Sequence, residues 1–294
     1  MRPLRFRDIY AQAERPVISF ELFPPRTPAG EKTLADALPL LRALRPDFMT
    51  CTYGAGGSTR DKTLEIVSRL RELEVEAACH LTCVGSSRDE LRILIRRIQD
   101  AGIFNIVALR GDPPRGESEF RPAKDGLAHA GELVELIRAE PGGDAMGVAV
   151  AGYPETHTEA ESPALDLAHL KRKVDAGADV VITQLFFDNA DFHRFCQRAV
   201  AAGIDAPIVP GLMPIQSSGQ IRRITAMCGA TIPADLDARL SAAGDDAQLV
   251  REIGVEHCIE QTRELCAAGV PGVHFYVLNT ARTMTRILGE TGLA

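Results

Sequence analysis

The stretch Val17-Ile18-Ser19-Phe20-Glu21-Leu22-Phe23-Pro24-Pro25 decides between the two common α/β architectures. It is a short apolar run with alternating residues, which predicts a strand at the start of a βα unit. An open, doubly wound sheet usually announces its dinucleotide site with the motif GxGxxG after this strand. Two prolines follow here instead, so the stretch favours a closed barrel over an open sheet, which is the alternative.

Seven similar apolar runs follow, and segments of helical period lie between them. The absence of a linker rich in Pro, Ser or Gly predicts a single (β/α)8 TIM barrel over residues 1–294, without a regulatory domain; such a barrel typically takes about 250 residues. The eight predicted strands are Val17–Phe23, Phe48–Gly54, Ala77–Val84, Asn105–Asp112, Met146–Pro154, Val180–Phe187, Ile208–Pro214 and Gly272–Asn279.

The segments between the runs predict helices, several of which end at a glycine. Two longer excursions break the rhythm, Pro113–His129 and Ile232–Ala268, and the second predicts an extra helical hairpin before the eighth strand. The predicted helices are Glu31–Arg45, Thr59–Glu74, Ser87–Ala101, Ala130–Ala139, Ala164–Ala176 and Ala190–Ala202, and the predicted helix-ending glycines are Gly102, Gly177, Gly203 and Gly269.

Composition narrows the class of protein. The chain has 294 residues, of which 45% are hydrophobic and 25% charged, as expected for a globular domain with a sizeable core. A net charge of −7 with dispersed basic residues argues against a nucleic-acid partner. The absence of a long apolar segment argues against a membrane span. Seven cysteines without CxxC pairs favour reduced thiols, a cytoplasmic location and no metal site.

Polar residues cluster at the predicted ends of the strands. In a barrel the chemistry takes place at the C-terminal ends of the strands, so each such residue is a candidate functional group. The set comprises Glu21, Thr52, Tyr53, His80, Thr82, Arg110, Asp112, Tyr153, Gln184 and Asn279.

Glu21 is the clearest candidate among these residues. Strand alternation turns Ile18, Phe20 and Leu22 toward the helices and therefore turns Ser19 and Glu21 toward the barrel axis. Burial among apolar neighbours without a cation raises the pKa of a carboxyl group, and a general acid that works near neutral pH needs such a shift. The alternative is a glutamate paired with a lysine or arginine.

The other candidates keep structural alternatives. Asp112 follows Arg110-Gly111 and precedes two prolines, so it could stabilise a cation or simply occupy a turn. His80 could be a hydrogen-bonded core histidine. The run Lys171-Arg172-Lys173 could be a solvated helix face or supply cations to a diphosphate. Cys79 and Cys83, four apart on one strand, are expected to be small core residues without a redox role.

Taken together and in order, the strand-end motifs closely resemble those of the bacterial methylenetetrahydrofolate reductases. The resemblance runs from about Val17 to Asn279, nearly the whole chain. The motifs are Ser19-Phe20-Glu21-Leu22-Phe23-Pro24-Pro25, Thr52-Tyr53-Gly54-Ala55, His80-Leu81-Thr82-Cys83, Ala108-Leu109-Arg110-Gly111-Asp112, Tyr153-Pro154-Glu155-Thr156-His157, Leu170-Lys171-Arg172-Lys173-Val174-Asp175-Ala176-Gly177-Ala178, and Ile182-Thr183-Gln184 through Phe187-Asp188.

The resemblance implies a barrel that holds FAD without a Rossmann motif. It implies that NADH or NADPH reduces the flavin and leaves, and that methylenetetrahydrofolate then takes its place and is reduced to 5-methyltetrahydrofolate for methionine synthesis. Glu21 is similar to the family's general acid, which helps to open the five-membered ring to an iminium. Asp112 is similar to the family aspartate that stabilises this cation and holds the folate ring.

The resemblance also assigns the binding residues. Glu21, Thr52, Asp112, Gln184 and Gln220 resemble substrate contacts, and Arg172 and Lys173 resemble partners of the flavin diphosphate. The flavin-binding set is Thr52, Tyr53, Ala55, His80, Arg110, Gly111, Asp112, Ala130, Tyr153, His157, Ala160, Asp166, His169, Arg172 and Lys173.

Three positions depart from the family pattern. Thr280 stands where the bacterial pattern often has an arginine, with Arg282 nearby as a possible replacement; Ile224 stands where relatives can have an aromatic residue; and His169 stands where some relatives have Asn. Family members are usually oligomeric, so a homo-oligomer is expected. The rival hypotheses are another flavin barrel, such as a proline dehydrogenase, and a non-catalytic flavin- or folate-binding protein. A Schiff-base barrel lacks a strand-end lysine.

Overall fold

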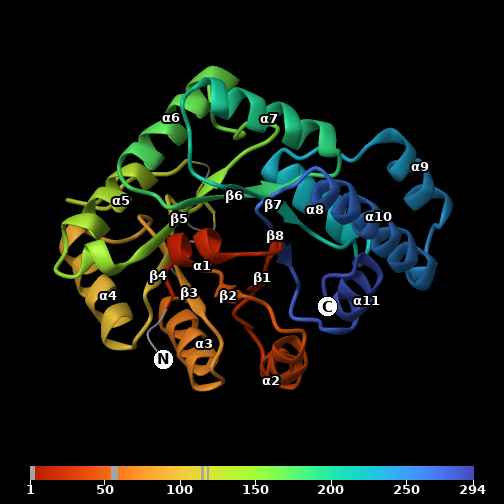
Figure 1. Ribbon diagram of the computed structural model, residues 1–294, viewed down its shortest axis with the longest axis horizontal. Helices are drawn as coiled ribbons and strands as arrows, with labels where there is room; N and C mark the ends of the chain where they lie inside the picture. The colour runs from red at the N-terminus through yellow and green to blue at the C-terminus, as the bar shows by residue number, and fades with distance from the viewer. Residues whose placement is uncertain (1–3, 54–58, 114–115, 118) are drawn as a thin grey trace.

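The computed structural model describes residues 4–53, 59–113, 116–117 and 119–294. Eight parallel strands form a closed barrel in chain order, and helices surround them (Figure 1). This architecture confirms the predicted (β/α)8 barrel. The strands are β1 (Val17–Leu22), β2 (Phe48–Cys51), β3 (Ala77–Thr82), β4 (Asn105–Leu109), β5 (Gly147–Gly152), β6 (Val180–Leu185), β7 (Ile208–Leu212) and β8 (Gly272–Tyr276).

Every strand ends earlier than the sequence predicts, by one to three residues. β4 ends at Leu109 and not at Asp112, and β8 ends at Tyr276 and not at Asn279. The apolar pattern continues past the last paired residue because the first loop residues still pack onto the barrel. Arg110, Asp112 and Tyr153 therefore lie on loops at the barrel mouth, and these loops can bring them together from different strands.

The helices match the predicted segments within a few residues at their ends. All four predicted helix-ending glycines adopt positive φ. No helix among the described residues combines the length and the apolar character needed to cross a membrane. The helices are α1 (Phe6–Gln12), α2 (Pro28–Ala43), α3 (Arg60–Glu72), α4 (Arg88–Asp100), α5 (Ala130–Ala139), α6 (Pro163–Asp175), α7 (Asn189–Ala201), α8 (Ser218–Cys228), α9 (Ala234–Ala242), α10 (Ala247–Ala267) and α11 (Arg282–Thr291).

The inserted helices differ in part from the prediction. α9 and α10 do occupy the segment Ile232–Ala268, but α10 contacts both α7 and α11 and so belongs to the outer ring. The added pair is therefore α8 and α9, which lie on the right of the barrel in Figure 1. Their apolar side chains, including Leu240 of α9, share a separate cluster with Leu185 at the end of β6 and Met213 just after β7. The insertion thus covers one side of the barrel mouth.

α1 closes the opposite end of the barrel, and the sequence pattern did not predict it. Phe6 and Ile9 are buried against the inward-facing residues of the strands, and the ring of Phe6 contacts that of Phe48 edge-on at 5.1 Å. α1 crosses in front of the strands in Figure 1. The inward residues in this cluster are Val17, Phe48, Ala78, Val107, Ala149, Val180, Ile182 and Val209.

We predict that Asn105→Ala will destabilise the protein by about 2 to 4 kcal/mol, because it removes one buried and one part-buried hydrogen bond and leaves backbone groups unpaired. The fully buried Asn105 accepts from Phe6 N and donates to Leu4 O, both at 2.8 Å. Urea unfolding followed by circular dichroism measures the change. Gln99→Ala is the control, since its bond to Pro141 O is exposed, and an equal loss in both variants would contradict the role of Asn105.

Candidate active site

Glu21 lies at the inward-facing C-terminal end of β1, as its strand alternation predicts. Its side chain is buried, with 7% of the residue exposed. Ile18, Phe20 and Leu22 belong to the core between barrel and helices, which confirms the predicted division of faces. The neighbouring strands bring Thr50 of β2 and Tyr276 of β8 level with Glu21.

Two buried histidines contact the Glu21 carboxyl group. The atom Oε2 lies 3.1 Å from His274 Nε2 and 3.4 Å from His80 Nε2. His80 Nε2 also lies 3.3 Å from Thr50 Oγ1, and His274 Nδ1 lies 2.8 Å from Ser19 Oγ. The sequence predicted apolar neighbours for this carboxyl group, but the structure places two histidines beside it. It is one end of a polar chain that runs inward from Glu21 through His274 to Ser19.

This chain can hold a proton at more than one atom. With Glu21 ionised, His274 Nε2–H donates to the carboxylate and Ser19 donates to Nδ1. With Glu21 protonated, its O–H donates to an Nε2 lone pair instead. Burial lowers the pKa of His80, partly opposed by the Glu21 charge, so His80 favours its neutral form. A neutral histidine accepts or donates at Nε2 according to its tautomer, so the pair of rings can accommodate both states of Glu21.

His274 and Ser19 were missed as functional residues. His274 is fully buried in the middle of β8, where the apolar neighbours Val273 and Phe275 make it resemble a core residue. Its role depends on the register Ser19↔His274 between the first and last strands. The one available signal was the alternation of β8, which places His274 and Tyr276 on the inward face.

Asp112 lies at the mouth but outside this chain of hydrogen bonds. Its side chain is exposed and makes neither a hydrogen bond nor a salt bridge within the described part of the protein. Its charge acts on Tyr153 and Arg110. Arg110 itself forms a two-pronged ion pair with Glu159, at 2.6 and 2.8 Å. Gly111, between Arg110 and Asp112 in the chain, has φ +88°, and an added Cβ would lie 2.7 Å from Val84. This turn therefore requires glycine.

The loop between β5 and α6 gathers several predicted flavin contacts. The rings of Tyr153 and His157 meet edge-on at 4.6 Å. The backbone N–H of His157 donates to Asp166 in the first turn of α6, at 3.1 Å. Lys173 of the same helix lies 5.9 Å from the Tyr153 ring and donates to Ala151 O at 2.5 Å. Tyr153, His157, Asp166 and Lys173 thus form one connected group.

The basic run on α6 separates into three environments. Lys171 forms an ion pair with Asp175, Arg172 is exposed, and Lys173 is half-buried. Lys173 has no carboxylate partner among the described residues, and burial lowers its pKa to about 8, opposed in part by Asp166. A cation held in this way without a counter-ion is suited to bind an anion. The Lys171 pairing, in contrast, is that of an ordinary helix surface.

The remaining members of the predicted flavin set have fewer contacts with the connected group of Tyr153, His157, Asp166 and Lys173. Ala130 begins α5, and His129 just before it meets the His169 ring edge-on at 5.9 Å. The backbone N–H of Ala160 donates to His157 O at 2.9 Å. Ala55 lies outside the described residues. Thr52 follows β2, where its carbonyl accepts from Thr63 at 2.8 Å.

Two buried hydroxyl groups at the mouth have no hydrogen-bond partner in the described part of the chain. They belong to Tyr53 and Thr82. Burial raises the pKa of Tyr53 to about 12, and the nearby Arg60 guanidinium opposes that shift. Thr82 is on β3, two residues beyond His80, and therefore shares its inward face. Unpaired buried hydroxyls cost free energy, which a bound ligand with polar atoms would recover.

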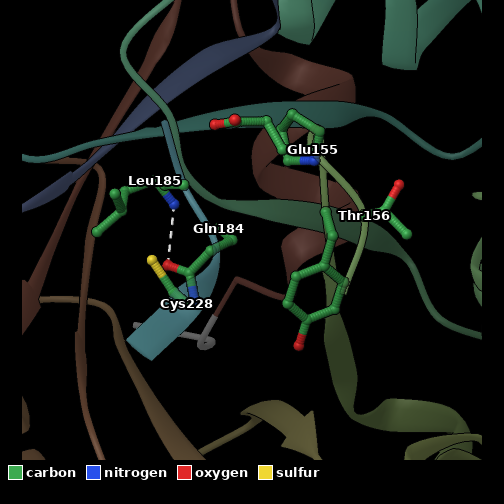
Figure 2. A pocket seen from close by; sticks show the side chains of 8 residues that line it. Glu155, Thr156, Gln184, Leu185 and Cys228 are labelled. Atoms are coloured by element: carbon green, nitrogen blue, oxygen red, sulfur yellow. Dashed lines mark hydrogen bonds between the residues drawn. The ribbon is translucent and has the colours of Figure 1, made fainter. Parts of the chain in front are cut away.

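A small pocket of about 170 Å3 lies on the side covered by α8, and it includes space open to solvent. Figure 2 shows Gln184 beside Cys228, with Glu155 and Thr156 on the opposite loop. The Gln184 carbonyl Oε1 accepts from Leu185 N at 2.9 Å. Gln220, the other predicted substrate contact, is half-buried on α8 and does not line this pocket.

The Cys79 and Cys83 thiols are buried, which agrees with a packing role. Burial raises the pKa of both thiols to about 12, so neither forms a thiolate readily. No group of three or more His, Cys, Asp or Glu side chains in the described ranges is arranged to hold a metal ion.

Comparison with known proteins identifies the family. The family model for methylenetetrahydrofolate reductase matches residues 5–292. The chain belongs to the methylenetetrahydrofolate reductase family. It is 40% identical over 277 residues to 5,10-methylenetetrahydrofolate reductase of Escherichia coli, covering 94% of this chain and 90% of that protein. It is 40% identical over 289 residues to methylenetetrahydrofolate reductase (NADH) 1 of Zea mays, covering 95% of this chain.

The chain spans about half the length of the plant relatives, 49% for the Zea mays protein. Among solved structures, a Clostridium thermocellum protein described as binding two copies of 5-methyl-5,6,7,8-tetrahydrofolic acid aligns with a TM-score of 0.65 at 16% identity. That alignment covers 97% of this chain and 95% of the other. At this identity the likeness shows the shared fold.

The three departures from the family pattern lie in different settings. Thr280 donates to Val277 O at 3.3 Å, and Arg282 is exposed at the start of α11 without a carboxylate partner among the described residues. Ile224 packs against the apolar cluster of α8 and α9. His169 on α6 keeps a polar ring, which meets the His129 ring edge-on. The Thr280 hydroxyl is thus used in a local hydrogen bond, whereas the Arg282 guanidinium, two residues further along the chain, is exposed.

Proposed function

We propose that this protein reduces 5,10-methylenetetrahydrofolate to 5-methyltetrahydrofolate, with FAD as cofactor and NADH or NADPH as the source of the hydride. The observation that carries the proposal is the Glu21 carboxyl group at the inner end of the barrel mouth, held by two histidines. Membership of the family supports the substrate class. The product would supply methyl groups for methionine synthesis.

Glu21 would act as the general acid for the folate. Opening the five-membered ring requires a proton on the folate nitrogen that leaves, and the ring-opened form carries an iminium cation. A carboxyl group buried beside His274 and His80 can be protonated between turnovers without leaving the barrel interior. General acid catalysis of this kind typically contributes about 10²- to 10⁴-fold.

Asp112 would stabilise the cation that forms on the folate. Its carboxylate is exposed at the mouth and has no hydrogen-bond or ion-pair partner in the part of the chain that the structure describes, so it is available to a ligand that enters there. A fixed negative charge stabilises a developing positive charge most effectively where a bound ligand excludes water. Glu21 and Asp112 therefore take separate roles: one donates a proton, and the other remains charged.

The residues at the mouth fit a flavin dinucleotide. The buried hydroxyls of Tyr53 and Thr82 have no hydrogen-bond partner among the described residues, which suits a ring with several polar atoms. Lys173, which has no carboxylate partner within the described ranges, and the exposed Arg172 suit a diphosphate. When bound, FAD would accept a hydride from the nicotinamide and pass it to the folate one-carbon unit. Tyr153, His157 and Asp166 would shape the same part of the site.

The rival functions have less support. A proline dehydrogenase would share a flavin barrel, but nothing in its chemistry calls for a proton donor such as Glu21. A non-catalytic folate- or flavin-binding protein would gain nothing from a buried carboxyl group on a chain of histidines, because burying it costs free energy. The family match likewise favours the reductase. A homo-oligomeric state stays a prediction.

We predict that the affinity for FAD will be nearly constant below about pH 8 and will fall above it, by up to about tenfold per pH unit. Lys173 has a pKa of about 8 in the free protein because burial disfavours its charged form. A bound diphosphate favours that form and raises the pKa of Lys173 in the complex. The complex then binds more protons than the free protein above pH 8, so raising the pH weakens binding.

Fluorescence titration of the flavin-free protein with FAD between about pH 7 and pH 10 measures this dependence. Lys173→Arg is the matched control, because an arginine keeps its charge throughout this range and should give a nearly flat profile. A flat profile for the wild-type protein would show that Lys173 does not bind the diphosphate.

The direct test of the proposed function is product formation. Purified protein should be yellow and should convert methylenetetrahydrofolate to 5-methyltetrahydrofolate with at least one nicotinamide. A colourless protein that turns over would rule out the flavin, and a flavoprotein that oxidises proline but leaves folate unchanged would favour the rival barrel.

A further inference from the structure

Tyr276 lies beside Glu21 at the barrel mouth and forms a hydrogen bond to β6, the strand that carries Gln184. It lies at the end of β8, level with Glu21 on β1, and its ring meets that of His274 edge-on at 5.4 Å. Its hydroxyl donates to the carbonyl of Thr183 on β6 at 2.8 Å. The side chain therefore reaches past β7, the strand between them, to a residue directly before Gln184.

Gly211 on β7 makes room for this side chain. It occupies an inward-facing position, level with His274 in the neighbouring strand. A Cβ added there would overlap the Thr183 carbonyl oxygen and would lie 2.9 Å from the Tyr276 ring and 3.0 Å from its hydroxyl oxygen. The Gly211 N–H also donates to Thr183 Oγ1 at 2.9 Å. Tyr276 and Gly211 thus hold both the carbonyl and the hydroxyl of Thr183.

The bond to Thr183 is made where β6 departs from regular pairing. The register between β6 and β7 shifts between Ile182 and Leu185, so the strand backbone between these residues lacks its regular partner. A buried carbonyl in such a position needs another donor. Burial, followed by the Glu21 charge, raises the pKa of Tyr276 well above its usual value, so the hydroxyl keeps its proton and remains that donor.

The direction of the Gln184 side chain depends on the backbone position of Thr183, the residue before it. Its Oε1 accepts from Leu185 N, which leaves the Nε2 group without an acceptor in the described part of the chain. Gln184 also lines the pocket on the α8 side. A shift of the Thr183 carbonyl would move the backbone of the next residue and so change where Nε2 points.

We propose that Tyr276 is a positioning residue for the folate step: its hydroxyl holds the Thr183 carbonyl and thereby aims the Gln184 amide at the substrate. This inference rests on the proposed function, in which Gln184 contacts folate. The described residues show no hydrogen bond between Tyr276 or Thr183 and the connected flavin group of Tyr153, His157, Asp166 and Lys173, although Tyr153 lines the same pocket as Gln184. Tyr276 should therefore affect folate binding and not the reduction of the flavin.

Tyr276→Phe tests the proposal because it removes the hydroxyl and keeps the ring over Gly211. Stopped-flow absorbance of the flavoprotein measures flavin reduction by the nicotinamide and flavin reoxidation by methylenetetrahydrofolate separately. We expect the folate concentration for half-maximal reoxidation to rise about tenfold, as loss of one hydrogen bond with a carbonyl left unpaired implies. Flavin reduction should change less than about twofold.

Tyr10→Phe is the matched control. The Tyr10 hydroxyl is also buried but has no hydrogen-bond partner in the described residues, and it lies on α1 at the closed end of the barrel. This variant should leave both half-reactions within about twofold of wild type. A tenfold change in the folate step of Tyr10→Phe would mean that the effect of Tyr276→Phe reflects general loosening of the barrel, and the proposal would be wrong.

A double-mutant cycle tests whether Tyr276 acts through Gln184. If it does, Tyr276→Phe should add less than about twofold to the effect of Gln184→Ala, because contacts that share one route are not additive. Independent, multiplying effects would overturn the proposal, as would an unchanged folate step in Tyr276→Phe. Wild-type protein that binds flavin but never reduces folate would refute the proposed function instead, so the two failures are distinguishable.

Discussion

Glu21→Gln is expected to slow the reoxidation of reduced flavin by methylenetetrahydrofolate by about a thousandfold, while flavin reduction by the nicotinamide stays within severalfold of wild type. Glutamine keeps the size of the side chain and can still contact His274 Nε2, but its amide cannot donate a proton to the folate nitrogen. Reduction of the flavin needs no proton from this position. Stopped-flow absorbance under anaerobic conditions resolves the two half-reactions.

Glu140→Gln is the matched control for this variant. Glu140 is also a buried carboxylate, with 8% of the residue exposed. It directly follows α5 and pairs with Arg92 and Arg96 of α4. Its substitution should lower stability and leave both half-reactions unchanged. An equal loss of both half-reactions in Glu21→Gln would overturn the role of Glu21 as the acid.

His274→Asn is expected to slow the folate step by about 100-fold, and His274→Gln by about tenfold. Asparagine places its amide near the position of Nδ1 and can keep the contact with Ser19, but it loses Glu21. Glutamine places its amide near the position of Nε2 and can keep Glu21 in place, but it cannot carry a proton. Both variants should reduce the flavin at wild-type rates.

The order of these two effects is the informative result. Steady-state turnover across pH and single-turnover reoxidation measure it together, and thermal unfolding reports whether either variant is misfolded. A folate step that is intact in His274→Asn would show that the polar chain from Glu21 to Ser19 has no part in the reaction.

The sequence was sufficient to predict the barrel and the direction of Glu21. Eight apolar runs and the alternation Ile18, Phe20, Leu22 carry this information locally, because side-chain direction in a strand depends on the neighbouring residues alone. The same local rule could not predict the residue at which each strand ends. Residues such as Arg110 and Tyr153 follow directly on apolar runs, and only strand pairing shows where the ladder stops.

The missed features depend on contacts between distant parts of the chain. His274 becomes part of the site through Ser19 and Glu21, which lie more than 250 residues away. α1 has seven residues, too few for a clear apolar period, and it is held by Asn105 from β4. α10 could be assigned to the outer ring only from its contacts with α7 and α11.

The resemblance to the family supplied what neither alternation nor composition could supply. Asp112 is an exposed loop residue without a hydrogen-bond or ion-pair partner among the described residues, so the physical pattern alone favoured a plain turn. Lys173 belongs to a basic run in which Lys171 forms a simple surface pair. The lowered pKa of Lys173 separates the two, and it depends on burial that the sequence does not display.

The most direct test of the account is an anaerobic titration of the purified flavoprotein, first with NADH or NADPH and then with methylenetetrahydrofolate. We expect one nicotinamide to bleach the flavin absorbance and the folate to restore it, with one 5-methyltetrahydrofolate formed per flavin. Reduced flavin that stays bleached when the folate is added, although oxygen restores its colour, would contradict the central claim.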